Sequence, residues 1–161
     1  MTTDEIYKAN TVVPQNRWSH VAFTKSGTTH RFFLNGVLDG SHTTSNETIA
    51  SGEDIRIGAD TNAAVGRPYG GFISNLRLIK GTALYTSNFT PPTEPLTNVT
   101  NTKLLCCQTY TDRTAAAVSP GTITGNGNAQ ANTFNPFTTD INAARGQESL
   151  YATLNPVSFR G

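Results

Sequence analysis

Apolar and polar residues alternate along several short segments, and this alternation predicts β-strands. In residues 18–25, Val21 and Phe23 hold alternate positions, which is the two-residue period of a strand with one face buried. Residues 30–34 alternate in the same way and lead directly into Asn35-Gly36, the dipeptide that most strongly favours a tight hairpin turn. The chain should return from that turn as a further strand. This region is therefore predicted to be an antiparallel meander.

The same features predict further strands along the chain. Residues 54–58 alternate, residues 72–79 form the longest strand candidate after a glycine-rich stretch, and residues 103–110 form the last one. Residues 80–85 are expected to form a turn that includes a short helical turn. The connections between predicted strands are short, so the sheets should be antiparallel and packed as a β-sandwich or jelly roll.

Composition supports an all-β fold and excludes several classes of function. Only 14% of the 161 residues are charged, against about 25% in an average globular protein, and Thr, Asn, Ser and Gly replace them. The formal net charge is +1 without a cluster of Lys or Arg, so nothing supports nucleic acid binding. No apolar run approaches the roughly 20 residues that cross a bilayer. The N-terminus lacks the basic-then-apolar layout of a secretory signal, so we expect release from a cell by another route, such as lysis.

The composition changes near Thr114, and this change predicts the domain organisation. We expect a β-sandwich over residues 1–111 and an extended C-terminal arm over residues 112–161 that packs on its own domain or on a neighbouring subunit. The beginning of the arm has too little apolar surface to offset the entropy of ordering on its own. Aromatic residues return at Phe134, and residues 138–150 are a candidate short helix.

The two cysteines of the chain, Cys106 and Cys107, are neighbours. Adjacent residues of a strand point to opposite faces, so a bond between them would need strained geometry, and we expect none. The favoured interpretation is that at least one of them is a small buried apolar group, and an intermolecular disulfide is the alternative.

Three motifs in combination resemble the middle strands of laminin-G/concanavalin-A-like jelly-roll domains. They are Asn-Arg-Trp-Ser-His-Val-Ala-Phe-Thr-Lys at 16–25, Phe-Leu-Asn-Gly at 33–36 and Ile-Arg-Ile-Gly at 55–58. Residues 71–92 resemble the version of this domain carried by virion proteins of marine phages, including those that infect cyanobacteria. Residues 132–155 are similar to the tail that follows the domain in such proteins.

The resemblance implies a structural or binding protein at the surface of a phage particle. It would be a capsid decoration protein or a component of the tail or fibre, assembled with other virion proteins and with further copies of itself. A full domain of this family has several strands before the Trp18 segment, and about 17 residues stand there here. Either the sandwich is shortened, or a partner supplies strands, because natural proteins cover unpaired sheet edges or use them for assembly.

The sequence predicts no enzyme. Catalysis needs convergent groups, and the acids of this chain are scattered without a paired motif, while its histidines lack metal-ligand spacing. We therefore predict no catalytic residues. The alternative function is an adhesin that binds a host surface glycan.

The resemblance also implies two candidate binding sites. Laminin-G-like domains often hold Ca²⁺ at the rim of the sandwich, and Asp39 and Asp60 are the candidates by position, with solvated turn aspartates as the more ordinary interpretation. No other cofactor is indicated. The glycan candidates are Asn62, Arg67 and Tyr69, in the glycine-rich loop before the longest predicted strand; a plain connecting loop is the alternative.

Overall fold

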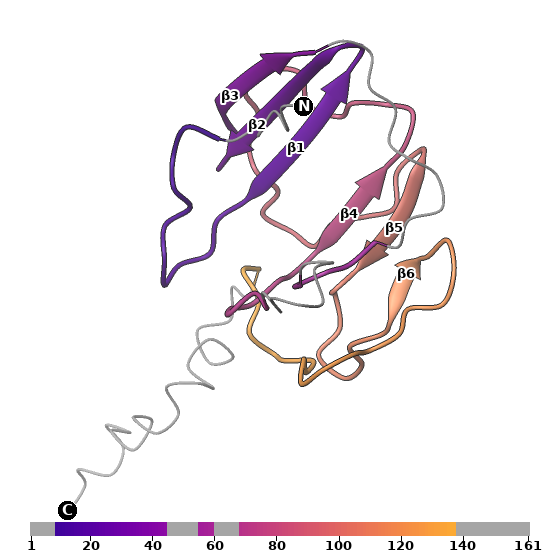
Figure 1. Cartoon of the computed structure of the whole chain (residues 1–161). Coiled ribbons are helices and arrows are strands. Elements are labelled where there is room, and N and C mark those ends of the chain that lie inside the picture. Colours follow the sequence, from indigo (N-terminus) through magenta and orange to yellow (C-terminus); the bar gives the residue numbers. More distant parts are fainter. Residues whose placement is uncertain (1–8, 45–54, 60–67, 138–161) are drawn as a thin grey trace, which may run out of the picture.

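The computed structural model describes residues 9–44, 55–59 and 68–137, and all regular elements in these ranges are strands. The strands are β1 (Val21–Ser26), β2 (Thr29–Leu34), β3 (Val37–Thr43), β4 (Leu76–Ile79), β5 (Thr102–Cys106) and β6 (Ala116–Val118). They form two antiparallel three-stranded sheets, in the orders β1-β2-β3 and β4-β5-β6. Figure 1 shows the first sheet at the top of the described body and the second below it. The predicted all-β, antiparallel fold is confirmed.

The hairpin between β2 and β3 forms where the sequence predicted it. Asn35 and Gly36 have φ values of 50° and 80°, the left-handed conformations that a tight hairpin turn requires at both central positions. Gly36 has a second role, because a Cβ atom there would lie 2.0 Å from the carbonyl oxygen of Phe89. The Phe89 amide donates a hydrogen bond of 2.8 Å to the Gly36 carbonyl oxygen. The turn therefore holds the segment around Phe89 against the first sheet.

The second sheet contains shorter strands than the alternation predicted. The long candidate at 72–79 is a strand only from Leu76, because Asn75 adopts a left-handed φ of 55° directly before it. In the same way β5 ends at Cys106, because Cys107 has a φ of 60°. Left-handed residues cannot continue the pleat, so they set the ends of both strands.

Two predicted elements are wrong. Residues 55–59 form no strand, and only an isolated bridge joins Ala59 to Pro68. The helical turn expected at 80–85 is a series of bends without helix. Both segments are connections whose conformation depends on contacts elsewhere in the fold rather than on local alternation. The helix candidate at 138–150 lies outside the described residues.

Each sheet has its own small buried centre. Phe33 of β2 is 1% exposed and packs edge-on against Phe89, with ring centroids 5.4 Å apart, and against Tyr85 at 6.5 Å. In the second sheet the buried apolar residues are Leu104, Leu105 and Cys106, all on β5. Among the described residues these four are the buried apolar positions, so most other large apolar side chains remain partly or largely accessible.

The first part of the expected C-terminal arm packs on the second sheet. β6 pairs with β5 as an edge strand, beyond the expected boundary at residue 111. Arg113 then donates hydrogen bonds to the carbonyl oxygens of Gly125, Gly127 and Ala129 and so holds this loop against the body. The described part of the arm therefore contacts the domain through β6 and again at Phe134, whose ring lies 5.2 Å from that of Trp18.

Candidate functional site

One face of the first sheet is apolar and accessible, and we call it the Phe23 face. Because side chains alternate along a strand, the pairings Val21 with Leu34 and Phe23 with Phe32 place these four residues on the same face. Val37 joins them from β3, since it pairs with Leu34. These five apolar residues make up the Phe23 face, and the same side of the sheet continues into Lys25, His30 and His42 toward the other end of the strands.

The exposure of this face is unusual for a sheet of this kind. Val21 is 60%, Phe23 56% and Val37 58% exposed. An antiparallel sheet that faces water on one side normally carries polar residues there, and the opposite face packs on the core. Clustered apolar side chains on an accessible sheet therefore indicate a surface that a further layer covers.

The opposite face of the same sheet is the packed one. Phe33 points to that side and lies against Tyr85 and Phe89, whose rings stack with centroids 3.6 Å apart. The Thr24 hydroxyl donates a hydrogen bond of 2.9 Å to the Tyr85 carbonyl oxygen and fastens the same segment. The sheet thus has one face packed against residues 85–89, whereas on the other face Val21, Phe23 and Val37 stay more than half exposed.

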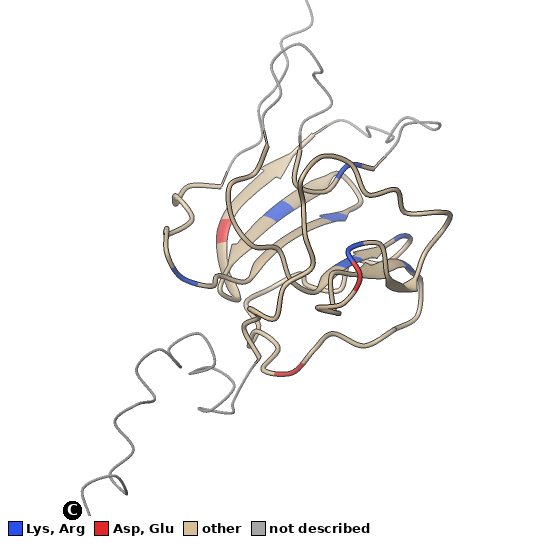
Figure 2. Ribbon diagram, turned by 90° about the horizontal axis from the view of Figure 1, so that it is seen from below, with Lys and Arg blue, Asp and Glu red and all other residues tan. Residues whose placement is uncertain are grey.

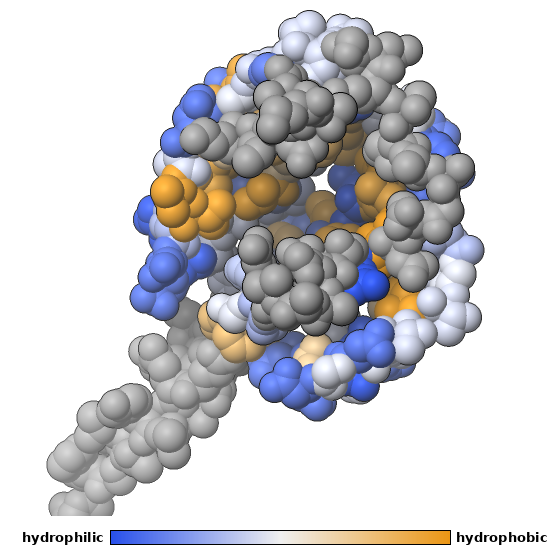
Figure 3. Space-filling view, in the orientation of Figure 1, coloured by the Kyte–Doolittle hydropathy of each residue, from blue (hydrophilic) through white to orange (hydrophobic). Residues whose placement is uncertain are grey.

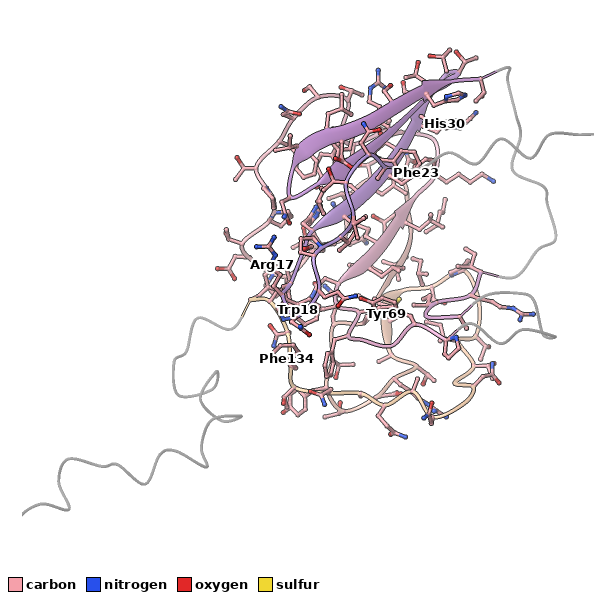
Figure 4. All side chains as sticks on the ribbon, turned by 60° about the vertical axis from the view of Figure 1, so that its left-hand side comes forward. Arg17, Trp18, Phe23, His30, Tyr69 and Phe134 are labelled. Carbon is pink, nitrogen blue, oxygen red and sulfur yellow. The ribbon has the colours of Figure 1, made fainter. Side chains whose placement is uncertain are left out.

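Aromatic contacts give the Phe23 face a fixed shape. The Phe23 and Phe32 rings lie with centroids 5.0 Å apart, and the His30 ring stacks on Phe23 at 5.6 Å with an interplanar angle of 26°. Figure 4 shows Phe23 and His30 next to each other, at the end of the sheet away from Trp18. His30 is itself 5% exposed, so it supports the 56% exposed Phe23 ring from within. Exposed aromatic residues such as Phe23 are enriched at protein interfaces.

Charge is sparse on this face and across the described chain. By register, Lys25 is the only charged side chain on the Phe23 side of strands β1–β3, and it stands at the end of β1 opposite His30. Figure 2 shows the charged residues scattered along the ribbon without a continuous acidic or basic surface. Apolar residues also come to the surface elsewhere, in the patches that Figure 3 shows in orange. The Phe23 face therefore favours an apolar partner over a charged one.

Of the two calcium candidates, Asp39 is a described residue. The Asp39 carboxylate accepts hydrogen bonds from the Thr11 hydroxyl and from the Thr11 amide, the latter at 2.9 Å. The hydrogen bond from the Thr11 side chain, followed by that from its backbone, lowers the pKa of Asp39. Asp39 thus fastens the segment before β1 to the edge strand β3. Asp60 lies outside the described residues, so a calcium site that uses both residues stays a prediction.

Of the glycan candidates, Tyr69 is described, whereas Asn62 and Arg67 lie outside the described residues. Tyr69 is 60% exposed, and its amide donates a hydrogen bond of 2.8 Å to the Gly58 carbonyl oxygen at the base of the loop. Its ring lies so close over Gly71 that a Cβ atom there would be 2.9 Å from the ring. Tyr69 is therefore an accessible ring held on a rigid base.

Trp18 belongs to an aromatic cluster with Phe72 and Phe134 rather than to an open binding surface. Its half-buried ring lies 5.2 Å from Phe134 and 6.5 Å from Phe72, and Phe72 and Phe134 contact each other edge-on at 4.9 Å. Figure 4 shows Trp18 and Phe134 close together. The position agrees with the interpretation of Trp18 as a core or near-core residue. Phe134 fastens the end of the described chain to the segment before β1.

A polar cleft of about 510 Å³ lies between the end of the second sheet and the loop that Arg113 holds. Its lining residues are Tyr110, Thr111, Asp112, Arg113, Gly127, Gln130 and Ala131. Tyr110 is 63% exposed, and one carboxylate oxygen of Asp112 accepts hydrogen bonds from the Thr114 amide and hydroxyl. This cleft has no motif in the sequence that predicts it, because it arises from chain segments that the loop brings together.

Within the described ranges, no group of three or more His, Cys, Asp or Glu side chains is placed to hold a metal ion. No helix of these ranges is long and apolar enough to cross a membrane. The arrangement is that of an antiparallel β-sandwich protein with an accessible apolar sheet face.

The comparison with protein families agrees with this class. A family model of the concanavalin A-like lectin/glucanases superfamily, of the laminin G type, matches residues 2–85, more than half of the chain. The chain belongs to this superfamily. As its name states, the superfamily includes both lectins and glucanases, so membership is compatible with carbohydrate binding, catalysis or a structural role. Neither the curated proteins nor the solved structures gave a match.

Proposed function

We propose that the chain is a non-catalytic structural protein of a phage virion that assembles by packing its Phe23 face against a second copy of itself. The observation that carries the proposal is the accessible apolar face of the first sheet, with Val21, Phe23 and Val37 each more than half exposed. The resemblance of residues 71–92 to virion proteins of marine phages supplies the setting. In that setting the protein sits at the particle surface, as a capsid decoration or as part of the tail or fibre, next to other virion proteins.

A second copy is the occupant that fits the Phe23 face best. Two sheets pack face to face in β-sandwiches when both contribute apolar side chains, and this sheet already has one apolar face covered from within. A two-fold arrangement would bring Phe23 of one copy against the same face of the other and so bury both Phe23 faces. The formal net charge of +1 and the single Lys25 on this side impose little repulsion between copies.

The proposal includes the absence of catalysis, and the surroundings of the carboxylates Asp39 and Asp112 support it. Asp112 is tied to Thr114 and stands beside Arg113, which is itself bound to three carbonyl oxygens. Asp39 is tied to Thr11. Each of these two described carboxylates is thus engaged by a threonine, whereas hydrolysis of a glycan uses two carboxyl groups about 5–9.5 Å apart across the bond that breaks. These acids support the fold locally.

The virion role predicts that the chain is a stoichiometric part of mature particles. Particles purified from a culture infected with the encoding phage should contain the chain by mass spectrometry, and brief protease treatment of intact particles should remove it before the interior proteins. Cross-linking on the particle should yield peptides from two copies joined close to β1 or β3. A chain found only in infected cells, and never in purified particles, would contradict the virion role.

A second candidate function, glycan binding, is favoured by two accessible tyrosine rings. Tyr69 is held over Gly71, and Tyr110 lines the polar cleft beside Asp112. An exposed ring next to hydrogen-bonding side chains suits a sugar, because one face of a sugar ring is apolar and its edge carries hydroxyl groups.

Single alanine variants of these tyrosines would locate a glycan site. If the chain binds a glycan on an array of host-surface polysaccharides, replacing the responsible tyrosine by Ala should weaken binding about tenfold or more, since an anchoring aromatic often contributes above 1 kcal/mol. The other tyrosine variant serves as the matched control. If Tyr69→Ala is the sensitive variant, the glycan site is the loop predicted from the sequence. If Tyr110→Ala is the sensitive variant, the glycan site is the polar cleft. No binding on the array, or binding equal in both variants, would remove this second function.

A further inference from the structure

The two neighbouring cysteines lie on the same side of the chain, contrary to the expectation for adjacent strand residues. β5 ends at Cys106, and Cys107 adopts a left-handed φ of 60°. This conformation breaks the strand alternation and turns the Cys107 side chain back toward its neighbour. As a result the two sulfur atoms lie 3.7 Å apart, and both thiols are free. A non-glycine residue with positive φ is uncommon, and such residues cluster at functional positions.

The surrounding hydrogen bonds hold Cys107 in this conformation. The Asn75 amide donates a hydrogen bond of 2.9 Å to the Cys107 carbonyl oxygen. The next residue, Gln108, donates from its side-chain amide to the Asn75 side-chain oxygen at 2.8 Å and to the Leu96 carbonyl oxygen at 2.7 Å. These bonds fix the backbone after Cys107, and the pairing of Cys106 with Leu76 in the sheet fixes it before. The approach of the two sulfurs is a property of the folded chain.

The two thiols differ in their surroundings. Cys106 is 3% exposed inside the second sheet, whereas Cys107 is only half-buried. The hydrogen bond from Cys106 lowers the pKa of Cys107 to about 7, and the same hydrogen bond, together with burial, raises the pKa of Cys106. The thiolate is the reactive form of cysteine. Cys107 is therefore the accessible and reactive member of the pair, and Cys106 is positioned behind it.

We propose that Cys106 and Cys107 form a redox modification site, a vicinal dithiol that hydrogen peroxide converts reversibly into an intramolecular disulfide. The Cys107 thiolate attacks one peroxide oxygen, the O–O bond breaks, and Cys107 becomes a sulfenic acid while one water leaves. The Cys106 sulfur then attacks the Cys107 sulfur, the S–O bond breaks, and a second water leaves. Two thiols and one peroxide thus give one disulfide and two waters. This site goes beyond the proposed assembly function and does not depend on it.

The disulfide should be easy to reduce. Bridged cysteines usually have Cα atoms about 4.4–6.8 Å apart, whereas neighbours in a chain stand about 3.8 Å apart. Closing the ring therefore strains the peptide between them, and strained disulfides have higher reduction potentials than structural ones. The strain falls at the end of β5, where Leu76 of β4 pairs with Cys106. Oxidation is thus expected to loosen the pairing of β4 with β5.

The proposal is tested on the full-length chain by intact mass spectrometry. Folded protein is first treated with hydrogen peroxide. One half is then alkylated directly with iodoacetamide, and the other half is reduced with a low concentration of dithiothreitol before alkylation. We expect the oxidised chain to lose the mass of two hydrogens, to take up no iodoacetamide, and to regain two reactive thiols after reduction. The same treatment in concentrated urea should close the pair at least tenfold more slowly, because the fold brings the sulfurs together.

Two single variants identify the roles of the cysteines. Cys106→Ser should stop at the sulfenic acid of Cys107, which dimedone traps, whereas Cys107→Ser should resist peroxide because its one thiol is buried. The proposal is overturned if the wild-type chain keeps two alkylatable thiols. It is also overturned if oxidation gives only sulfinic acid or a disulfide between chains, or if closure is as fast in urea as in the folded protein. The urea comparison uses the wild-type chain, so it holds even if a variant fails to fold.

Discussion

Replacing Phe23 by Asp is expected to weaken self-association of the chain about 100-fold or more. In the proposed dimer the Phe23 ring, now 56% exposed, packs against the sheet of the partner. An Asp at this position removes that apolar contact twice, once from each copy, and places a carboxylate in an apolar interface where it has no partner. Sedimentation equilibrium over a range of protein concentrations measures the change in the dissociation constant.

Val12→Asp is the matched control for this variant. Val12 is 85% exposed and lies in the segment before β1, outside the strands that carry the Phe23 face. The same charge is added to an accessible apolar residue, so we expect the dissociation constant to stay within about twofold. Far-UV circular dichroism of both variants reports whether the sheets remain. Equal weakening by the two variants, or none by Phe23→Asp, would show that the Phe23 face is not the interface.

Replacing Gly36 by Ala should destabilise the fold by about 2–5 kcal/mol. Gly36 has a φ of 80°, which disfavours any residue with a Cβ atom, and a Cβ there would lie 2.0 Å from the Phe89 carbonyl oxygen. The variant must therefore move either the hairpin or the segment that covers Phe33. Urea unfolding of the two proteins, followed by tryptophan fluorescence of Trp18, measures the loss.

Gly27→Ala separates the conformational cost from the steric one. Gly27, in the turn between β1 and β2, also has a positive φ, of 58°, but a Cβ atom there would have no neighbour within 4 Å. The Gly27→Ala variant should therefore lose only about 1–2 kcal/mol of folding stability, which is the cost of placing a Cβ atom in the left-handed conformation. A loss in Gly36→Ala no larger than in Gly27→Ala would mean that the close approach of Phe89 does not constrain the fold.

The parts of the fold that depend on local patterns could be predicted from the sequence. The meander around Asn35-Gly36 follows from alternation and from a dipeptide that accepts positive φ at both positions. The failures share one cause. Asn75 and Cys107 interrupt the strands predicted at 72–79 and 103–110, because contacts with distant residues hold them in left-handed conformations. The alternation of apolar and polar residues carries no information on such contacts.

The candidate site could be predicted only in part from the same patterns. Alternation places Val21 and Phe23 on one face, but it does not reveal whether that face is covered. That depends on Tyr85 and Phe89, which come from a connection and pack on the opposite side, behind Phe33. The closeness of the two thiols could not be foreseen either, because the expectation of opposite faces assumes that Cys107 continues the strand.

The mass of the wild-type chain in solution, measured by light scattering after size exclusion, tests the central claim most directly. A chain that completes its sandwich by packing two Phe23 faces together should have about twice the mass of the 17.2 kDa protomer at micromolar concentration. A stable, folded monomer at all concentrations would contradict the account, because it would mean that the apolar face of the first sheet needs no second copy.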